Sequence, residues 1–497
     1  MKHIRVAFDQ SQGTISKHIY GHFAEHIGGV FYDGLWVGED SKVENVHGFR
    51  KALVDSFKQI NPPNLRWPGG CFAETYDWRD GIGPREQRPT RVNWWYSHDH
   101  RLESNHVGTH EFMELCGMLG AEPYVAANMT SLTPMHIRNW MEYCNFPAGS
   151  TTLAKERGQN GHEEPFNVKY WGIGNENWGG GGQMSPEMCA REFVKYATVC
   201  NSLDKGGRKF IFCGPNGHDV AWTRRVMQEW ARNSFHEAPV FGMSVHYYCS
   251  FAGDPLTFNE DEWYQQLFQA DRMRQVLDDH RAAMDEFDPD RKIGMVVDEW
   301  GCWHPDGSGP SKGYNLFEQQ STMRDAVVAA MTLNIFNERC DYVAMANVAQ
   351  LCNNLHSLYL AGGEHFVQTP NYYVFDMFKT HQDAKQLHVI SDCGTFTREG
   401  FRDMPQVSAS ASQAADGSVT VTLANLNMTS AVELELSGIG AALAGQATIT
   451  TLADADVHAH NTFEQPERIV STKKQTAFAD GQVVTLPAGG IVSVVIR

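Results

Sequence analysis

The stretch Val168-Lys169-Tyr170-Trp171-Gly172-Ile173-Gly174-Asn175-Glu176-Asn177-Trp178 runs directly into four glycines, Gly179 to Gly182. Its first half is an apolar run of strand length, and its second half places a glutamate between two asparagines. The glycines end any regular structure, so we predict a buried strand that carries Glu176 into a loop. Polar groups that leave a core need partners, which favours a functional site over a chance strand end.

Seven further stretches have the same form, an apolar run that ends in polar residues. They begin near His18, Asn64, Pro123, Lys209, Gly242, Ile293 and Tyr342. Each interval between neighbouring strands has room for a helix and two loops, the pattern of parallel α/β folds. Eight such units predict a fold of the α/β class, a (β/α)8 TIM barrel. In such a barrel the carboxyl ends of the strands converge on one face.

The segments between these strands carry helix signals. Thr109 is a candidate N-cap, apolar residues follow it at helical spacing, and Gly120 is suited to end the helix. Ser185-Pro186-Glu187 has the form of a helix start, with proline at the first helical position and an acid in the first turn. We also predict a long, mostly apolar helix from Ser321 to Phe336.

The helical patterns stop after about Phe375. Stretches with period-two alternation follow, separated by turn residues, and predict a C-terminal antiparallel β-sandwich, jelly-roll-like. They are Ser418 to Leu423, Ala431 to Leu436, Ala447 to Leu452 and Ile491 to Ile496. The alternating Ile4, Val6 and Phe8 predict an N-terminal strand, which we place in the sandwich because a closed barrel has no edge to offer. The predicted domains are residues 1–17, contributing to the sandwich, 18–375, the barrel, and 376–497, the sandwich.

The chain has 497 residues with 41 basic and 59 acidic side chains, a formal charge of −18. A field of this sign repels nucleic acid and anionic membrane, so we expect neither as a partner. No window reaches the length of a membrane span, and the N-terminus lacks the apolar region of a signal peptide. The eleven cysteines are scattered without a Cys-x-x-Cys pair, which indicates a reduced, cytoplasmic location rather than a disulfide framework or a zinc site.

A second glutamate ends the stretch Ile293-Gly294-Met295-Val296-Val297-Asp298-Glu299, again just before a tryptophan. On strands four and seven of the barrel, Glu176 and Glu299 would face each other across its mouth. Hydrolysis of an acetal needs one group that protonates the leaving oxygen and another that captures or hydrates the oxocarbenium-like centre, and two carboxyls can divide these tasks. Other polar strand ends would share this face: Glu25, Arg66, Asn128, Asn175, His246, Asp298 and Asn347.

At these positions the sequence resembles the α-L-arabinofuranosidases of glycoside hydrolase family 51. The matching stretches run from the first strand to the eighth, the trailing sandwich matches too, and the resemblance covers essentially the whole chain. The stretches are Tyr20-Gly21-His22-Phe23-Ala24-Glu25-His26, Arg66-Trp67-Pro68-Gly69-Gly70, Asp80-Gly81-Ile82-Gly83-Pro84, Gly174-Asn175-Glu176-Asn177, Asp298-Glu299-Trp300 and Ala346-Asn347-Val348-Ala349-Gln350.

The resemblance implies a configuration-retaining double displacement with Glu176 as general acid/base and Glu299 as nucleophile. Retention predicts carboxyl groups about 5 to 5.5 Å apart, closer than in inverting enzymes. The resemblance also implies an exo-acting enzyme that releases terminal arabinofuranose from oligosaccharides of arabinoxylan or arabinan. A homo-oligomer, commonly a hexamer, is implied as well.

The resemblance further implies a set of substrate-binding residues. Sugar hydroxyls would be bound by Glu25, Asn175 and Gln350, with Tyr248 near the nucleophile. Arg66 would support the nucleophile, or would be a buried ion-pair partner that never touches sugar. Cys71 belongs to the same set, although a thiol is a weak hydrogen-bond donor. Loop aromatics would shape the subsites, or only cover the core: Trp94, Trp178 and Trp303.

Other functions stay open from the residues alone. The same barrel and carboxylates would serve another glycoside, such as a xyloside, a galactofuranoside or an endo-β-glucan. A carbohydrate-binding protein with an inactive barrel is disfavoured, because binding alone does not need two facing carboxylates. The stretch 94–101 is the part of the barrel least like the family, and we expect it to influence which leaving group is accepted.

We expect no metal and no cofactor. His22 and His26 lie on a strand and its following loop and so do not share a helical face, and His98 and His100 lack cysteine partners. We expect His246 to orient the catalytic groups by hydrogen bonding rather than to bind a metal.

Overall fold

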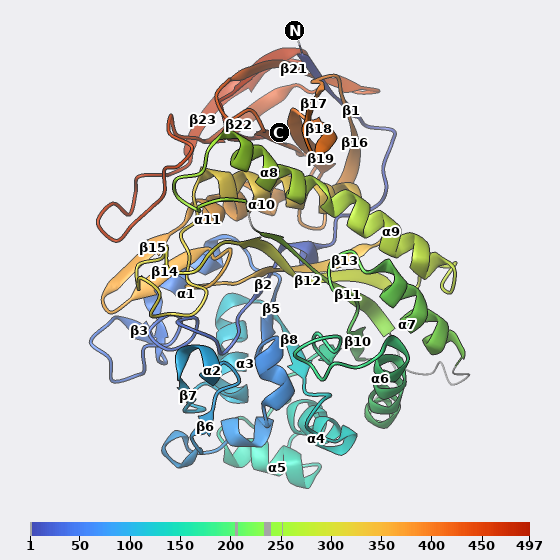
Figure 1. Cartoon of the computed structure of the whole chain (residues 1–497), viewed down its shortest axis with the longest axis vertical. Helices are drawn as coiled ribbons and strands as arrows, with labels where there is room; N and C mark the ends of the chain where they lie inside the picture. The colour runs from blue at the N-terminus through green and yellow to red at the C-terminus, as the bar shows by residue number, and fades with distance from the viewer. Residues whose placement is uncertain (1, 204–206, 233–239, 251) are drawn as a thin grey trace. The chain divides into compact units, whose positions relative to one another are not determined.

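The computed structural model describes residues 2–203, 207–232, 240–250 and 252–497 (Figure 1). The chain divides into two compact units. The first unit comprises Met1–Tyr20, Tyr248–Gln275 and Trp300–Arg497, and the second comprises Gly21–Tyr247 and Val276–Glu299. The domain limits predicted from the sequence stay a prediction.

Eight strands form a closed barrel in the order β10, β11, β12, β13, β2, β5, β8, β9 (Figure 1). From β2 through β5, β8, β9 and β10 to β11, each strand runs parallel to the next. The strands are β2 (Gly21–Phe23), β5 (Asn64–Trp67), β8 (Glu122–Ala127), β9 (Tyr170–Ile173), β10 (Lys209–Phe212), β11 (Val240–Ser250), β12 (Gly294–Trp303) and β13 (Val343–Ala349). The predicted (β/α)8 barrel is confirmed.

The first barrel strand is shorter than its sequence stretch indicates. Lys17–Tyr20 form the 3-10 helix η1, and only Gly21–Phe23 is strand. Ile19 and Tyr20 are consecutive and both buried, and the Tyr20 hydroxyl donates a hydrogen bond to Asn337 Oδ1 at 2.9 Å. A helical turn, held by this hydrogen bond, therefore replaces the first half of the predicted strand.

The predicted helices form, with small differences at their starts. Ser185 caps α6 by accepting a hydrogen bond from Met188 N, as its hydroxyl is suited to do. Gly120 ends α3 in the left-handed conformation, at φ 69°. Thr109 is not the N-cap of α3 but its first residue, because the N–H of Gly108 donates to the Glu111 carboxylate and the helix begins there.

The helices are α1 (Lys51–Gln59), α2 (Tyr96–Asp99), α3 (Thr109–Leu119), α4 (Pro134–Asn145), α5 (Thr152–Gln159), α6 (Pro186–Asn201), α7 (Val220–Arg232), α8 (Glu260–Asp271), α9 (Met273–Asp285), α10 (Met323–Glu338) and α11 (Pro370–Phe378). Two-stranded sheets pair β3 (Asn45–Val46) with β4 (Phe49–Arg50), β6 (Arg91–Val92) with β7 (Leu102–Glu103), β14 (Tyr359–Gly362) with β15 (His365–Gln368), and β17 (Thr395–Arg398) with β18 (Phe401–Pro405).

The C-terminal part is a mostly antiparallel nine-stranded sheet, in the order β23, β22, β25, β20, β19, β16, β1, β21, β24. Its strands are β1 (Lys2–Ala7), β16 (Lys385–Ser391), β19 (Val407–Gln413), β20 (Val419–Asn425), β21 (Val432–Ile439), β22 (Gly445–Leu452), β23 (Thr472–Phe478), β24 (Gln482–Leu486) and β25 (Ile491–Ile496). Alternate apolar residues such as Ile4, Val421, Leu434 and Val494 form one buried core, which explains their period-two pattern.

The N-terminal strand joins this sheet, as predicted. β1 pairs antiparallel with β16 and parallel with β21. Figure 1 shows it as a blue strand beside the orange and red strands of the C-terminal part. Ile4 and Val6 are fully buried in the sheet's core, so the first residues of the chain contribute to a core built mainly from the last hundred.

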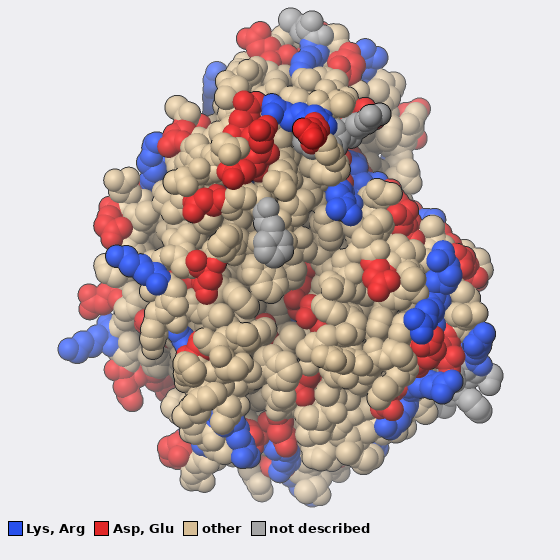
Figure 2. Space-filling view, in the orientation of Figure 1, with Lys and Arg blue, Asp and Glu red and all other residues tan. Residues whose placement is uncertain are grey.

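Charged side chains of both signs lie near one another on the face shown in Figure 2, and most of that face is uncharged. In the part of the chain that the structure describes, no helix has the length and apolar character needed to span a membrane. All eleven cysteines lie among the described residues, and none of them forms a disulfide there.

A buried polar network joins α10 to the sheet within the first unit. Asn334 Oδ1 accepts hydrogen bonds from Ser410 Oγ and Thr422 Oγ1, both at 2.8 Å, and Asn334 Nδ2 donates to Ser408 Oγ at 3.1 Å. All four residues are buried. The helix therefore supplies a hydrogen-bond partner to each of these three hydroxyls.

We predict that Asn334→Ala lowers the free energy of unfolding by about 2 kcal/mol, because buried hydroxyls lose their partner. The measurement is thermal denaturation, where a lower melting temperature is expected. Gln228→Ala, at an exposed position on α7, is the control and should leave the melting temperature unchanged. Equal melting temperatures for both variants would contradict a stabilising role for the network.

Candidate active site

Glu176 follows β9 in an unusual backbone conformation. Its φ is +44°, in the left-handed region that residues with a side chain seldom adopt. Gly179 N and Gly181 N both donate to the carbonyl of Glu176, at 2.8 and 3.0 Å, so the glycine run wraps around it. A Cβ at Gly181 would lie 1.8 Å from the carbonyl oxygen of Asn175, which explains why this turn requires glycine.

His246 on β11 links the two glutamates that the sequence singles out. Its Nδ1 lies 2.8 Å from Glu176 Oε1 and 3.4 Å from Glu299 Oε2. The interacting oxygen and nitrogen atoms of these three residues all lie within 4.8 Å of one another. The structure thus brings Glu176 and Glu299 together and places His246 in hydrogen-bond contact with Glu176. The catalytic roles of these residues stay predictions.

The other ring nitrogen of His246 forms an ion pair with Asp298, Nε2 to Oδ1, at 3.1 Å. Carboxylates only accept hydrogen bonds, so a ring with carboxylates at both nitrogens is best satisfied as the doubly protonated imidazolium. Burial alone would lower the pKa of His246, but the charges of Glu299 and Asp298 outweigh it and hold this pKa well above its usual value.

Arg66, at the end of β5, is the second cation of the site. Its Nη1 donates to Glu299 Oε1 at 2.8 Å, its Nη2 donates to Asn175 Oδ1 at 2.7 Å, and its Nε lies 3.6 Å from Asp298 Oδ2. Burial raises the pKa of Glu299, and the charges of His246 and Arg66 counteract that rise. For Asp298, burial opposes ionisation, but Arg66 and His246 together lower its pKa.

The two glycines after Arg66-Trp67-Pro68 are required by these carboxylates. A Cβ at Gly69 would lie 2.8 Å from Glu25 Cγ, and a Cβ at Gly70 would lie 2.8 Å from Glu299 Oε1. The backbone of this loop therefore passes directly against two acidic side chains. This close approach explains the Gly-Gly pair physically.

Glu25 and Cys71 lie at the same site. Glu25 is buried, and its Oε1 accepts hydrogen bonds from Phe72 N at 3.0 Å and Trp95 Nε1 at 3.3 Å. Burial, with the charge of Glu299, raises the pKa of Glu25 to about 7. The Cys71 thiol donates to Glu176 Oε2 at 3.6 Å, and burial together with the charge of Glu176 raises the pKa of this thiol, so it stays protonated.

Trp94 lies beside the same site, and Trp178 follows the Asn-Glu-Asn sequence. A Cβ built on Gly180 would lie 2.7 Å from Cys71 Sγ and 3.4 Å from a ring atom of Trp94, so all three are neighbours. Trp94 is 36% exposed and Trp178 is partly buried. Neither tryptophan is fully buried in the core.

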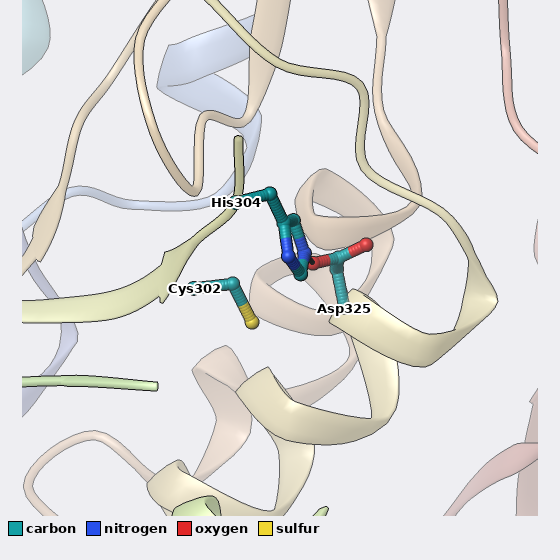
Figure 3. A group of neighbouring side chains, drawn as sticks. All are labelled: Cys302, His304 and Asp325. Carbon is teal, nitrogen blue, oxygen red and sulfur yellow. Dashed lines mark hydrogen bonds and ion pairs between the residues drawn. The ribbon is translucent and has the colours of Figure 1, made fainter. Parts of the chain in front are cut away.

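In the described residues, two groups of side chains bring potential metal-binding atoms within 4.8 Å of one another. One is Glu176, His246 and Glu299. The other is Cys302, His304 and Asp325 (Figure 3), where His304 Nε2 contacts Asp325 Oδ1 at 2.7 Å and Gln266 Nε2 donates to Cys302 Sγ at 3.2 Å. Thr322 donates to the other oxygen of Asp325. The facing atoms of this second group are thus engaged in hydrogen bonds within the protein.

Comparison with known proteins assigns the family. A model of the α-L-arabinofuranosidase 1 domain matches residues 56–216, and one of the α-L-arabinofuranosidase C-terminal domain matches residues 298–489. An intracellular exo-α-L-arabinofuranosidase of Bacteroides ovatus is 39% identical over 500 residues, which cover 99% of this chain and 94% of that protein. The chain belongs to the family 51 α-L-arabinofuranosidases.

Solved structures agree with this family 51 assignment. The family 51 arabinofuranosidase of Xanthomonas axonopodis pv. citri has a TM-score of 0.93 at 36% identity, covering 100% of both chains. The α-L-arabinofuranosidase of Thermotoga maritima, solved as an arabinose complex, has a TM-score of 0.87 at 30% identity, also covering 100% of both chains.

Three predicted substrate-binding residues of this family 51 enzyme belong to the first unit, whereas the site above lies in the second. They are Tyr248, Trp303 and Gln350. The rings of Tyr248 and Trp303 contact edge to face, with centroids 5.1 Å apart. Gln350 is buried, and its N–H donates to Asn354 O. The roles of these residues stay predictions.

Sequence reasoning missed Glu74, a buried acid that lies beside the Glu176 backbone. Glu74 lies in the 3-10 helix η2 (Cys71–Thr75), is fully buried, and contacts the backbone beside Glu176. No periodicity or motif marks it, since its partners are three backbone N–H groups and one side-chain amide, all distant from it in the sequence. The roles of Asp298 and Arg66 had a signal, because both end apolar strands.

We predict that Arg66→Met destabilises the protein by about 3–5 kcal/mol, because Asp298 and Glu299 remain buried after losing a cation. Thermal denaturation should show a clearly lower melting temperature. Arg225→Met, which breaks the exposed ion pair with Glu187, is the matched control and should have little effect. A melting temperature for Arg66→Met as high as that of the control would show that the buried charges do not need Arg66.

Proposed function

We propose that the enzyme is a retaining, exo-acting α-L-arabinofuranosidase that hydrolyses terminal non-reducing arabinofuranosyl groups of arabinoxylan- or arabinan-derived oligosaccharides. The observation that carries the mechanism is the approach of a carboxylate oxygen of Glu176 and one of Glu299 to within 4.8 Å. Retaining glycosidases hold their two carboxyls about 5 to 5.5 Å apart, whereas inverting enzymes leave about 6.5–9.5 Å for a water molecule. The short separation supports double displacement.

In the first step, a Glu299 oxygen attacks the anomeric carbon while the bond to the leaving oxygen breaks. Glu176 donates its proton to that oxygen, so the leaving group departs as a neutral alcohol. The product is an ester between arabinofuranose and Glu299. Arg66 and His246 favour the ionised form of Glu299 before the attack, as a nucleophile requires.

In the second step, Glu176 accepts a proton from water, and the water oxygen attacks the anomeric carbon. The ester bond breaks, Glu299 regains its charge, and arabinose leaves with the configuration of the substrate. Glu176 suits this double role because its side chain is 19% exposed, whereas that of Glu299 is 9% exposed. The group that exchanges protons with water is the more accessible one.

We assign substrate binding to the residues that the family resemblance implies. The buried acceptor Glu25 and the amide of Asn175 would bind sugar hydroxyls, and Cys71 would contact the sugar beside Glu176. The remaining assignments are Arg66, Tyr248, Gln350, Trp94, Trp178 and Trp303. Hydroxyl groups bound by buried polar atoms give strong selectivity, since an analogue without the hydroxyl leaves those atoms unpaired.

We also propose a cytoplasmic location and a homo-oligomeric state. The relative from Bacteroides ovatus is named intracellular and exo-acting. An intracellular exo-enzyme fits short imported oligosaccharides better than polymers. Oligomerisation is proposed from membership of the family.

We predict that Glu299→Ala loses turnover by about 10 000-fold or more, because the ester cannot form. Azide should restore turnover of an aryl arabinofuranoside by Glu176→Ala, because this small anion attacks the ester without a general base. Proton NMR of the product should show the α-configured arabinofuranosyl azide. A β-configured azide from Glu176→Ala would contradict the proposed roles.

A panel of para-nitrophenyl glycosides distinguishes between the possible substrates. The proposal requires cleavage of the α-L-arabinofuranoside far above that of the β-xyloside and the galactofuranoside. Preferred cleavage of another glycoside would leave the roles of the two carboxylates intact but would contradict the proposed substrate.

We predict that His246→Asn moves the acidic limb of the pH profile of kcat/KM to higher pH. That limb follows ionisation of the nucleophile, and the charge of His246 lowers the pKa of Glu299, so its removal lets this pKa rise. His218→Asn, which loses an ion pair with Asp279 on the surface, is the control and should leave the limb in place. A limb that stays put or moves to lower pH in His246→Asn would contradict the argument.

A further inference from the structure

Glu74 is a buried carboxylate that accepts hydrogen bonds from four N–H groups of the described residues, and none of these groups is a cation. Its Oε2 accepts from Met129 N and Thr130 N, both at 2.8 Å. Its Oε1 accepts from Asn175 N at 2.6 Å and from Asn177 Nδ2 at 3.2 Å. Glu74 has no exposed surface. A carboxylate is placed here at considerable desolvation cost and is stabilised only by neutral amides.

These donors lie on the loops that follow two neighbouring barrel strands. Met129 and Thr130 follow the end of β8, and Asn175 follows the end of β9. The hydroxyl of Ser131 also donates to the carbonyl of Glu74, at 2.8 Å. One side chain and its backbone therefore connect both strand ends to η2, the turn that also carries Cys71.

Two donors to Glu74 flank Glu176 in the sequence, just after the end of β9. Asn175 N lies immediately before it, and the amide of Asn177 lies immediately after it. Asn177 Nδ2 is shared between Glu74 and the carbonyl of Gly181, at 2.7 Å from the latter. The left-handed conformation of Glu176 costs about 1–3 kcal/mol and persists only where the surroundings impose it. Glu74 supplies a fixed point on each side of that residue.

The site specifies a carboxylate and not an amide of the same shape. All four donors are N–H groups, and a carboxylate offers two acceptor oxygens. Glutamine has one acceptor oxygen, and its NH2 group would face two N–H donors. Burial raises the pKa of Glu74 to about 7, and the hydrogen bond from Asn175 N is the largest effect that opposes this rise.

We propose that Glu74 is a positioning residue that fixes the backbone from Asn175 to Asn177 and thereby aims the Glu176 carboxyl at the leaving-group oxygen. It acts through Glu176 and touches no substrate atom. The proposal rests on the proposed acid/base role of Glu176. It predicts that damage to Glu74 impairs proton delivery more than it impairs sugar binding.

The test compares Glu74→Gln on two substrates, benzyl and para-nitrophenyl α-L-arabinofuranoside. A benzyl alcohol needs protonation to leave, so its kcat/KM should fall by about 100-fold, the scale of general acid catalysis. The nitrophenolate leaves without help, so its kcat/KM should fall less than about fivefold. Azide should also accelerate turnover of the nitrophenyl substrate by Glu74→Gln, as in Glu176→Ala.

Asp288→Asn is the matched control. Asp288 is a buried carboxylate of the same unit that accepts hydrogen bonds from Lys292 N and Ile293 N, at the other end of β12 from Glu299. Its substitution should change both substrates equally. Should Glu74→Gln fail to fold, Asn177→Ala removes one of the four donors and should show the same leaving-group dependence at smaller size.

The outcomes separate the two proposals. If Glu176→Ala shows the leaving-group dependence and folded Glu74→Gln, or Asn177→Ala in its place, loses activity equally on both substrates or not at all, the positioning role is overturned alone. If Glu176→Ala itself shows no leaving-group dependence and no azide effect, the acid/base assignment falls, and the positioning role falls with it.

Discussion

Three carboxylates, Glu176, Asp298 and Glu299, share two cations, Arg66 and His246, and the rest of the site depends on this balance. A buried carboxylate is tolerated only when it is paired or hydrogen-bonded, so neither cation can be spared without leaving a charge unpaired. His246 contacts all three acids, and Arg66 contacts two of them. Three negative charges against two positive ones reach neutrality only when one carboxyl carries a proton. That is the state from which general acid catalysis begins.

The barrel makes this balance possible because its strands end on one face. Arg66 is the last residue but one of β5, Glu176 follows β9, and His246 and Glu299 lie on β11 and β12. The charged side chains are packed so closely that the loop after Arg66 has no room for side chains of its own. Gly69 and Gly70 meet this requirement. Glu176 adopts a left-handed backbone conformation that residues with a side chain seldom take. Such exceptions are usual at functional sites.

The sequence predicted those parts whose signals are local. Apolar runs with polar ends identified all eight barrel strands and both catalytic candidates, since a polar residue at the end of a buried run needs a hydrogen-bond or charge partner. The place of β1 followed from the absence of a free barrel edge. Glu74 was not predictable, because its partners are backbone and side-chain amides distributed over two other loops. The helical turn at Lys17–Tyr20 was missed because a short apolar run does not distinguish a turn from a strand.

The neutral surroundings of Glu74 follow from the chemistry beside it. Its charge is stabilised by backbone and side-chain amides, whereas the charges of Glu299 and Asp298 are stabilised by Arg66 and His246. A lysine or arginine paired with Glu74 would add a further cation near Glu176, which already contacts His246 at 2.8 Å. The proposed acid must hold a proton until the leaving oxygen takes it. The amide donors hold Glu74 in place on both sides of Glu176 without adding a positive charge to the site.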